Sequence, residues 1–179
     1  MTDAELLEKT ANPDTRNFGF NLLVRKYQQK VYWLIRKMVI DHDDADDLTQ
    51  ETFIKVWQAL PNFRGDAQLY TWIYRIATNE CLNFLAKKRR RFFLPISDVE
   101  NELSEKLDEN PDLTGDEIQV RLQKAILTLP DKQRLVFNLR YFDEMKYEDM
   151  AEITGTSVGA LKASYHLAVK KVEEFLNKH

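Results

Sequence analysis

The chain has 179 residues, of which 44% are hydrophobic, so it can bury a core and is too apolar to be disordered throughout. Its net charge of −3 argues against a protein that coats nucleic acid indiscriminately. The single cysteine, Cys81, excludes an intrachain disulfide, and no secretory leader or bilayer-length apolar run is present. We therefore expect a cytoplasmic protein.

The first 92 residues are typical of helices throughout. Apolar residues from Phe20 to Met38 recur at spacings of three and four, which predicts one long helix. The acidic run from Asp41 to Asp47 follows, and negative charge is favourable at a helix N-terminus, so a second helix is expected to begin there. Pro61 cannot continue that helix. The expected helices cover about 17–40, Asp41 to Leu60 and about 69–90, with a loop at 62–68.

An acidic segment separates two mildly basic blocks. Residues 1–92 hold 15 basic and 12 acidic residues, a net of +3. Residues 93–119 hold 1 and 9, a net of −8, and residues 120–179 hold 10 and 8, a net of +2. Helical periodicity fades from Leu94 to about Asp116, where prolines and acids are frequent. We expect an all-α protein with helical domains over 1–92 and 118–179, joined by a flexible acidic linker over 93–117 that can hold a short helix.

The segment from Tyr147 to Lys171 is typical of two helices joined by a tight turn. Gly155 can adopt the left-handed conformation that ends a helix, and Thr156 or Ser157 can cap the next one. In the second helix an apolar stripe lies opposite a slim, basic face, as entry into a DNA major groove requires. An ordinary helical hairpin with solvated lysines is the alternative. The stripe comprises Val158, Leu161, Tyr165, Ala168 and Val172, and the opposite face comprises Gly159, Ala163, His166 and Lys170, with Lys162 on its flank.

The run from Lys87 to Arg91 places five cations at the expected end of the third helix. A solvated cap favoured by the helix dipole is the simplest interpretation. Aromatic residues on the same helix admit a second one, because aromatics interleaved with cations suit stacking on unpaired bases and neutralising phosphates. These aromatics could equally belong to the core. They are Tyr70, Trp72, Tyr74 and Phe84.

His42 lies within the acidic run and raises the possibility of a metal site. Consecutive residues point in different directions, however, and no second cluster supplies the remaining ligands. A turn that leads into a charged helix start is the favoured interpretation, and a metal-dependent hydrolase centred on His42 is a remote alternative.

Several segments in a fixed order carry a resemblance to a known family. Residues 44–57, which read DADDLTQETFIKVW, resemble conserved region two of bacterial extracytoplasmic-function (ECF) sigma factors. Phe63 to Asp66 and Thr71 to Asn79 follow at the expected distance. Leu129 to Phe142 and Tyr147 to Ala151 resemble the start of region four. The resemblance covers about residues 18–92 and 118–177.

The resemblance implies a non-enzymatic sigma subunit without catalytic residues, metal or cofactor. It would bind core RNA polymerase through the β′ clamp helices and the β flap, bind promoter DNA, and be held inactive by an anti-sigma factor. The acidic linker would thread toward the polymerase active-site cleft. By the resemblance, the β′-binding positions are matched by Asp47, Gln50 and Glu51. The loop that captures a flipped minus-ten base is matched by Asn62, Phe63, Arg64 and Asp66, and that DNA would be tracked by Arg75, Asn79, Lys87, Lys88, Arg89, Arg90 and Arg91. The minus-thirty-five element would be read by Ser157, Lys162, Ser164 and His166.

One departure from the family concerns the last of these sets. Many relatives carry arginine where this chain has Ser164, Leu167 and Val169, which puts the identity of the base-reading residues in doubt and weakens the anchoring to phosphates. The main alternative function is a stand-alone helix-turn-helix regulator, which would bind DNA tightly without polymerase and would leave the Asp47 face without a role.

Overall fold

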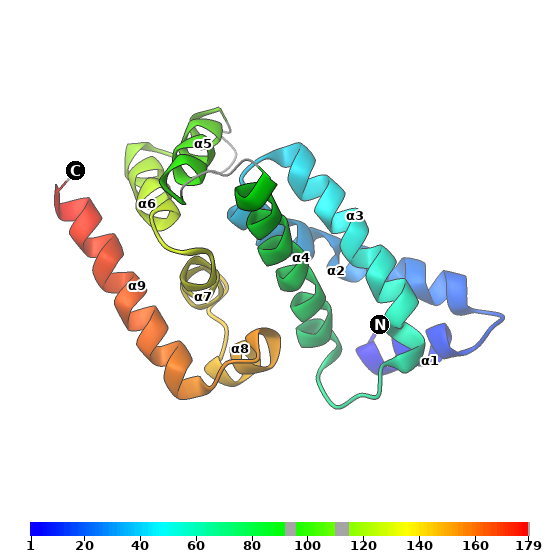
Figure 1. Ribbon diagram of the computed structural model, residues 1–179. Helices are drawn as coiled ribbons and strands as arrows, with labels where there is room; N and C mark the ends of the chain where they lie inside the picture. Colours follow the sequence, from blue (N-terminus) through cyan, green and yellow to red (C-terminus); the bar gives the residue numbers. More distant parts are fainter. Residues whose placement is uncertain (92–95, 110–114, 179) are drawn as a thin grey trace.

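The computed structural model describes residues 1–91, 96–109 and 115–178, and these residues form α-helices with one short 3-10 turn and no strand (Figure 1). The predicted all-α fold is therefore confirmed. The N-terminal half contains α1 (Asp3–Ala11), α2 (Arg16–Val39), α3 (His42–Ala59), the 3-10 turn η1 (Leu60–Asn62) and α4 (Leu69–Arg91).

The start of α3 shows why the acidic run forms a helix terminus. Asp41 is its N-cap, and its carboxylate accepts a hydrogen bond of 2.9 Å from the backbone N–H of Asp44. This bond lowers the pKa of the Asp41 carboxyl against the opposing effect of burial. The preceding residue, Ile40, ends α2 with a positive φ of 67°, which turns the chain sharply enough for α3 to fold back on α2.

The N-terminal helix α1 packs closely on α2. Leu6 is buried between them, and the Tyr27 hydroxyl donates a 2.7 Å hydrogen bond to Asp3. Gly19 permits the close approach, because a Cβ atom added there would lie 2.8 Å from the Cβ of Lys9.

The linker contains the short helix that the sequence allowed for, α5 (Ile96–Asp108). Leu103 and Leu107 of this helix are buried with Ile40 at the α2–α3 corner and Leu127 of the C-terminal half. Lys106 also lies 3.8 Å from Asp41 and from Asp44. The described part of the linker thus packs against both halves of the molecule. The predicted linker residues 93–95 and 110–114 lie outside the described residues.

The C-terminal half contains α6 (Glu117–Leu127), α7 (Asp131–Tyr141), α8 (Tyr147–Thr154) and α9 (Val158–Lys178). The predicted turn between the last two helices is confirmed. Gly155 adopts the left-handed conformation with φ 71°, and the Ser157 hydroxyl accepts a 3.2 Å hydrogen bond from the backbone N–H of Ala160. The predicted apolar stripe of α9 faces inward, with Leu161, Ala168 and Val172 buried.

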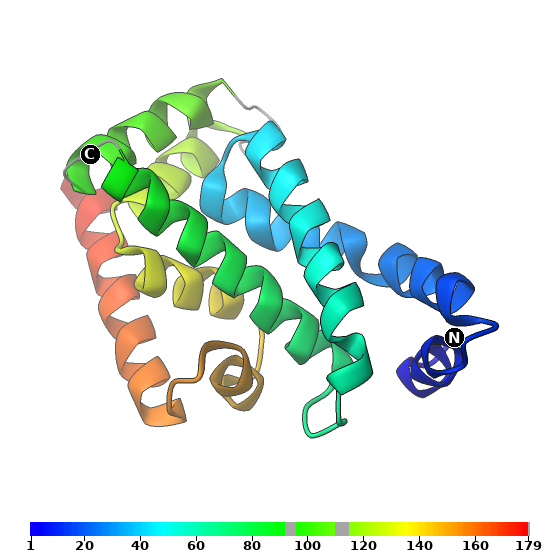
Figure 2. The same ribbon diagram turned by 45° about the vertical axis from the view of Figure 1, so that its right-hand side comes forward.

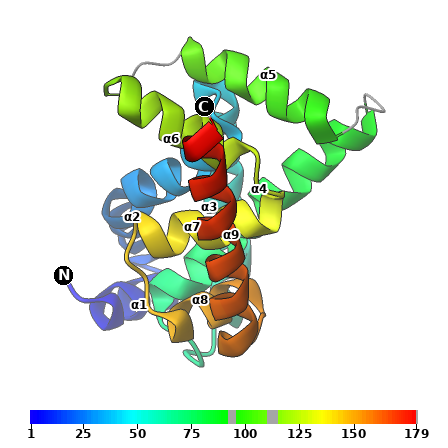
Figure 3. The ribbon, with the colours of Figure 1, turned by 90° about the vertical axis from the view of Figure 1, so that its left-hand side faces the viewer.

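The two halves pack against each other, and α4 lies between α3 on one side and α7 and α8 on the other (Figure 2). One hydrophobic cluster contains residues of both halves. At its edge Arg134 of α7, which is 1% exposed, donates a 2.9 Å hydrogen bond to the carbonyl of Met38 near the end of α2. The free chain therefore has a closed arrangement, which leaves α9 on the outside of the molecule (Figure 3).

Candidate functional site

The exposed face of α3 combines polar side chains with an apolar groove. Asp47, Gln50 and Glu51 are all exposed, as expected for residues that contact a partner. Beside them Ile54 leaves 53% of its surface exposed. The groove, about 570 Å³ in volume, lies between α2 and α3 and is lined by Phe20, Val24, Gln28, Asp46, Thr49, Gln50, Phe53, Ile54 and Trp57. A polar rim around exposed apolar surface is a combination that suits a protein partner.

A second cavity, of about 550 Å³, lies beside the 62–68 loop. Phe63 packs against Trp72 of α4 with ring centroids 4.8 Å apart, and Gly65 turns the loop with a φ of 78°. Arg64 also lines the cavity, whereas Asn62 and Asp66 are exposed without lining it. Apolar walls with a guanidinium group suit a flat aromatic ligand that carries hydrogen-bond acceptors.

The opposite wall of this cavity was not anticipated from the sequence. It consists of residues between Leu7 and Arg16, to which the motifs assigned no role. Nothing in the local pattern identifies them, because the packing of α1 on α2 is what brings these residues to the loop.

The cations of α4 do not form one free cluster. Arg75 and Asn79 are exposed, as are Lys87, Arg90 and Arg91 at the end of the helix. Lys88 forms a 2.7 Å ion pair with Glu102 of α5. Arg89 forms an ion pair with Asp131 of α7. In the closed arrangement Lys88 and Arg89 are thus engaged by acids of the linker and of the C-terminal half.

The outer face of α9 presents the predicted small and basic residues. Gly159, Lys162, Ala163, His166 and Lys170 are exposed, and the Nζ atom of Lys162 lies 5.7 Å from the ring centroid of Tyr147. Ser157 is exposed at the start of the helix, where its hydroxyl is the cap. Ser164 is half-buried and lies two positions from both Lys162 and His166, which on a helix of about 3.6 residues per turn places it on the other flank. Ser164 is therefore on a different flank of the helix from Lys162 and His166.

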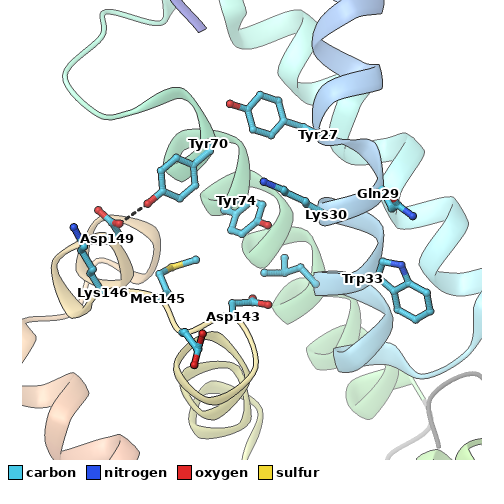
Figure 4. Close-up of a pocket in the computed structure, with 12 residues that line it drawn as sticks. Tyr27, Gln29, Lys30, Trp33, Tyr70, Tyr74, Asp143, Met145, Lys146 and Asp149 are labelled. Carbon is cyan, nitrogen blue, oxygen red and sulfur yellow. Dashed lines mark hydrogen bonds between the residues drawn. The ribbon is translucent and has the colours of Figure 1, made fainter. Parts of the chain in front are cut away.

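A cleft of about 600 Å³ lies where the two halves meet (Figure 4). Tyr27 and Trp33 of α2 and Tyr70 and Tyr74 of α4 supply its aromatic surface. The Tyr70 hydroxyl donates a hydrogen bond to Asp149 of α8. Burial raises the pKa of Tyr70, and this hydrogen bond raises it further; burial also raises the pKa of Tyr74, to about 12.

His42 lies in a network that differs from a metal site. Its Nδ1 atom is 2.6 Å from the Tyr32 hydroxyl and 3.5 Å from the guanidinium of Arg36. Among the residues that the structure describes, no three His, Cys, Asp or Glu side chains are grouped so that they could hold a metal ion. The network supports the interpretation of this segment as a structural turn. Within the same part of the chain, no helix combines the length and apolar character needed to cross a membrane.

Comparisons with known proteins assign the two halves of the chain to two known family regions. The sigma-70 region 2 family model matches residues 23–91, and the sigma-70 region 4 model matches residues 119–172. The chain is 38% identical over 184 residues to the RNA polymerase sigma-H factor of Pseudomonas aeruginosa, covering 97% of this chain and 93% of the relative. It is 34% identical over 183 residues to the ECF RNA polymerase sigma-E factor of Escherichia coli strain K12, with the same two coverages.

Solved structures share the fold at lower identity. A sigma factor RpoE, in complex with the anti-sigma factor NepR from Bartonella quintana, superimposes with a TM-score of 0.68 at 23% identity, covering 88% of this chain and 96% of that one. CnrH, in complex with the cytosolic domain of CnrY, superimposes with a TM-score of 0.69 at 23% identity, covering 98% and 97%.

Proposed function

The chain belongs to the ECF subfamily of RNA polymerase sigma factors, and we propose that three of its surfaces divide the work of promoter-specific initiation. The observation that carries this is the presence in one chain of region 2 and region 4, each with an exposed surface suited to its task. Polymerase docking supplies affinity, and two DNA-reading surfaces supply specificity. The polymerase carries out the chemistry, in the cytoplasm, and we assign no catalytic step to this chain.

The face of α3 is the proposed docking surface for the β′ clamp helices. Asp47, Gln50 and Glu51 are exposed and offer charge and hydrogen bonds. The neighbouring Ile54 and the groove between α2 and α3 add apolar area, which would be buried on binding. The polar residues would then fix the orientation of the complex, and the apolar groove would contribute most of its free energy.

The cavity beside the 62–68 loop is the proposed site of minus-ten recognition. A base that leaves the duplex exposes its hydrogen-bonding edge and both faces of its ring, so it needs an enclosed binding site. Phe63 and Arg64 supply an apolar surface and a donor there. The exposed Asn62 and Asp66 would contact the adjoining backbone. Along α4 the exposed Arg75, Asn79, Lys87, Arg90 and Arg91 would follow the strand, and Lys88 and Arg89 would join them after release from Glu102 and Asp131.

The exposed face of α9 is the proposed reader of the minus-thirty-five element. Lys162 and His166 lie on this face, and Ser157 lies at the helix N-terminus, the end that helix-turn-helix proteins direct toward base edges. Ser164 is half-buried and lies on a different flank of α9, so we assign it the smallest share of this recognition. Docking of this half on the β flap would hold it at the promoter despite its few cations.

An anti-sigma factor is a further proposed partner. The superimposed sigma factor RpoE was solved with such an inhibitor, the anti-sigma factor NepR. In this chain the aromatic cleft between the halves, with Trp33 and Tyr70 on its walls, offers a surface on which an inhibitor helix could pack. An inhibitor bound there would contact both halves and so stabilise the closed arrangement.

The decisive experiment combines the purified chain with bacterial core RNA polymerase and a genomic promoter library, followed by sequencing of the transcripts. Discrete start sites that share two upstream elements, and that are absent with core polymerase alone, are expected. Folded protein that neither binds polymerase nor produces new start sites would instead favour the stand-alone regulator, which should bind its DNA tightly by itself.

A further inference from the structure

The cavity beside the 62–68 loop has a second wall, which comes from outside the recognised family regions. Leu7, Thr10 and Ala11 of α1 and Arg16 at the start of α2 line it. The region 2 match begins at residue 23, so no family motif assigns these residues a role. The residues of this wall are positioned to support the loop and also to contact a base that enters the cavity.

The wall is held in place by specific contacts. Thr2 caps α1 in a reciprocal arrangement with Glu5, with hydrogen bonds of 2.8 and 3.2 Å. The Thr15 hydroxyl donates a 2.8 Å hydrogen bond to the carbonyl of Lys9, which closes the turn between α1 and α2. With the close approach at Gly19, these contacts give α1 a defined position relative to the loop.

Arg16 presents hydrogen-bond donors at this wall. Its guanidinium lies over the ring of Trp57, 4.0 Å from the centroid, and donates a 3.5 Å hydrogen bond to the Trp57 carbonyl. A guanidinium carries five N–H donors in a planar fork, and the described hydrogen bonds use one of them. Stacking on Trp57 restricts the rotation of the guanidinium group and leaves its other N–H groups available, so Arg16 is pre-organised to bind a pair of acceptors.

The cavity favours acceptors over donors. Arg64 adds a second guanidinium from the loop, and no acidic side chain is found among the described residues that line the cavity. The Thr10 hydroxyl already donates to the carbonyl of Leu7, over 2.9 Å. Cytosine and guanine each present two adjacent acceptors, O2 and N3 or O6 and N7, whereas adenine and thymine alternate donors with acceptors along their edges.

We propose that Arg16 is a specificity-determining residue, which reads the acceptor edge of a flipped cytosine or guanine while α1 forms the wall behind that base. This inference rests on the proposed capture of a minus-ten base by the 62–68 loop. It adds a determinant from the N-terminal segment and the class of base that the cavity takes.

The first test changes the charge and fork of Arg16. In transcription with core polymerase from a promoter library, Arg16→Ala should reduce the preference for cytosine or guanine at one minus-ten position by roughly 5- to 150-fold, the range for a lost base contact. Arg16→Lys should restore little of it, because an ammonium lacks the bidentate fork. Arg25→Ala is the matched control, since Arg25 is an exposed arginine on the same helix that does not line the cavity. Which of the two bases is preferred follows from the same library.

The second test fills the cavity without touching Arg16. Ala11 is exposed and lines the cavity, whereas Ala4 is exposed on the same helix and does not. Ala11→Trp should reduce transcription from promoters that depend on the captured base at least about tenfold, with polymerase binding unchanged. Ala4→Trp should leave both properties unchanged.

The outcomes separate this inference from the function on which it rests. If a loop replacement over 62–68 alters the minus-ten preference while Arg16→Ala and Ala11→Trp do not, base capture stands and the role of Arg16 is refuted. An equal loss on every promoter with Arg16→Ala would show a phosphate contact and also refute it. If neither the loop nor the wall affects the preference, base capture by this loop is itself refuted.

Discussion

The two proposed DNA-reading surfaces differ in shape and in origin. The minus-ten surface is a cavity of about 550 Å³ whose walls come from α1, the start of α2 and the η1–α4 loop. The minus-thirty-five surface is one exposed face of α9 on the outside of the molecule (Figure 3). An unpaired base must be enclosed on its faces and edge, whereas a duplex groove is read by a protruding helix. Each surface therefore has the shape that the state of its DNA requires.

The largest effect is expected where both surfaces depend on one contact, the docking of α3 on polymerase. Asp47→Lys should weaken polymerase binding roughly 10- to 1000-fold, since juxtaposed like charges across an interface cost several kcal/mol. Transcription from every promoter should then fall by a similar factor. Titration of fluorescent core polymerase with the variant measures the loss of binding. Glu173→Lys makes the same charge change at an exposed position of α9 and is the control. Unchanged binding by the Asp47 variant would refute the docking assignment.

The next effect should separate the two surfaces. Replacing residues 62–68 by a glycine and serine sequence of equal length should reduce minus-ten preference about 10- to 100-fold. The minus-thirty-five preference should persist, because α9 shares no residue with the cavity. A promoter library randomised in both elements measures the two preferences in one experiment, and a parallel loss of both would contradict a division of labour.

A substitution on the opposite surface should give the reverse result. Lys162→Ala should weaken minus-thirty-five recognition by about 1–3 kcal/mol if Lys162 contacts a base edge. Competition between promoters that differ at single positions gives this value. Lys171→Ala, an exposed lysine on the other flank of α9, is the matched control. A loss of the same size on every sequence would identify Lys162 as a phosphate contact.

Gly19→Ala tests whether the cavity depends on tertiary packing. The added Cβ would lie 2.8 Å from the Cβ of Lys9 and 3.0 Å from the backbone of α1, so α1 must move. Overpacking of this kind costs about 1–3 kcal/mol in the free energy of unfolding, which urea denaturation measures. The minus-ten preference should weaken about threefold. This loss is smaller than the one expected when residues 62–68 are replaced. Full preference in a destabilised variant would show that the position of α1 is unimportant for recognition.

The smallest effect is expected at Ser164. Because Ser164 lies on the other flank of α9 from Lys162 and His166, Ser164→Ala should change minus-thirty-five recognition by less than about 0.5 kcal/mol. His166→Ala, measured in the same competition assay, should have the larger effect. The reverse order would show that α9 approaches the DNA with a different face.

Local patterns predicted one surface much better than the other. The α9 face follows from periodicity within a single helix. Gly155 predicted one end of the turn before it, and the other end was narrowed to Thr156 or Ser157, of which the structure selects Ser157. On the other side, the 62–68 loop was singled out through the family resemblance, whereas α1 and Arg16, which line the cavity beside it, were not anticipated. Their contribution depends on Gly19, which allows two helices to approach, and no pattern along one helix contains that information.

The relative position of the halves was also beyond the reach of sequence patterns. The region-four resemblance of Leu129 to Phe142 assigned no contact to Asp131 or Arg134, yet Arg89 pairs with Asp131 and Arg134 is buried against the end of α2. Likewise Glu102 belongs to the segment that the sequence predicted to be a flexible acidic linker, yet it pairs with Lys88 of α4. Such contacts join residues 14 to 96 positions apart in the chain, and every one of them depends on how whole helices pack.

The sequence by itself determined the all-α class, most of the long helices, the turn before α9 and the family, because helix periodicity, capping and motif order are properties of neighbouring residues. It also determined which face of α9 is exposed. The tertiary structure alone decided that α1 and Arg16 line the cavity beside the 62–68 loop. It also decided that Ser164 differs from Lys162 and His166 in its degree of burial, and that the two halves are closed on each other. The physical reason is that a cavity or an interdomain contact is created by the packing of distant segments, which no local pattern specifies.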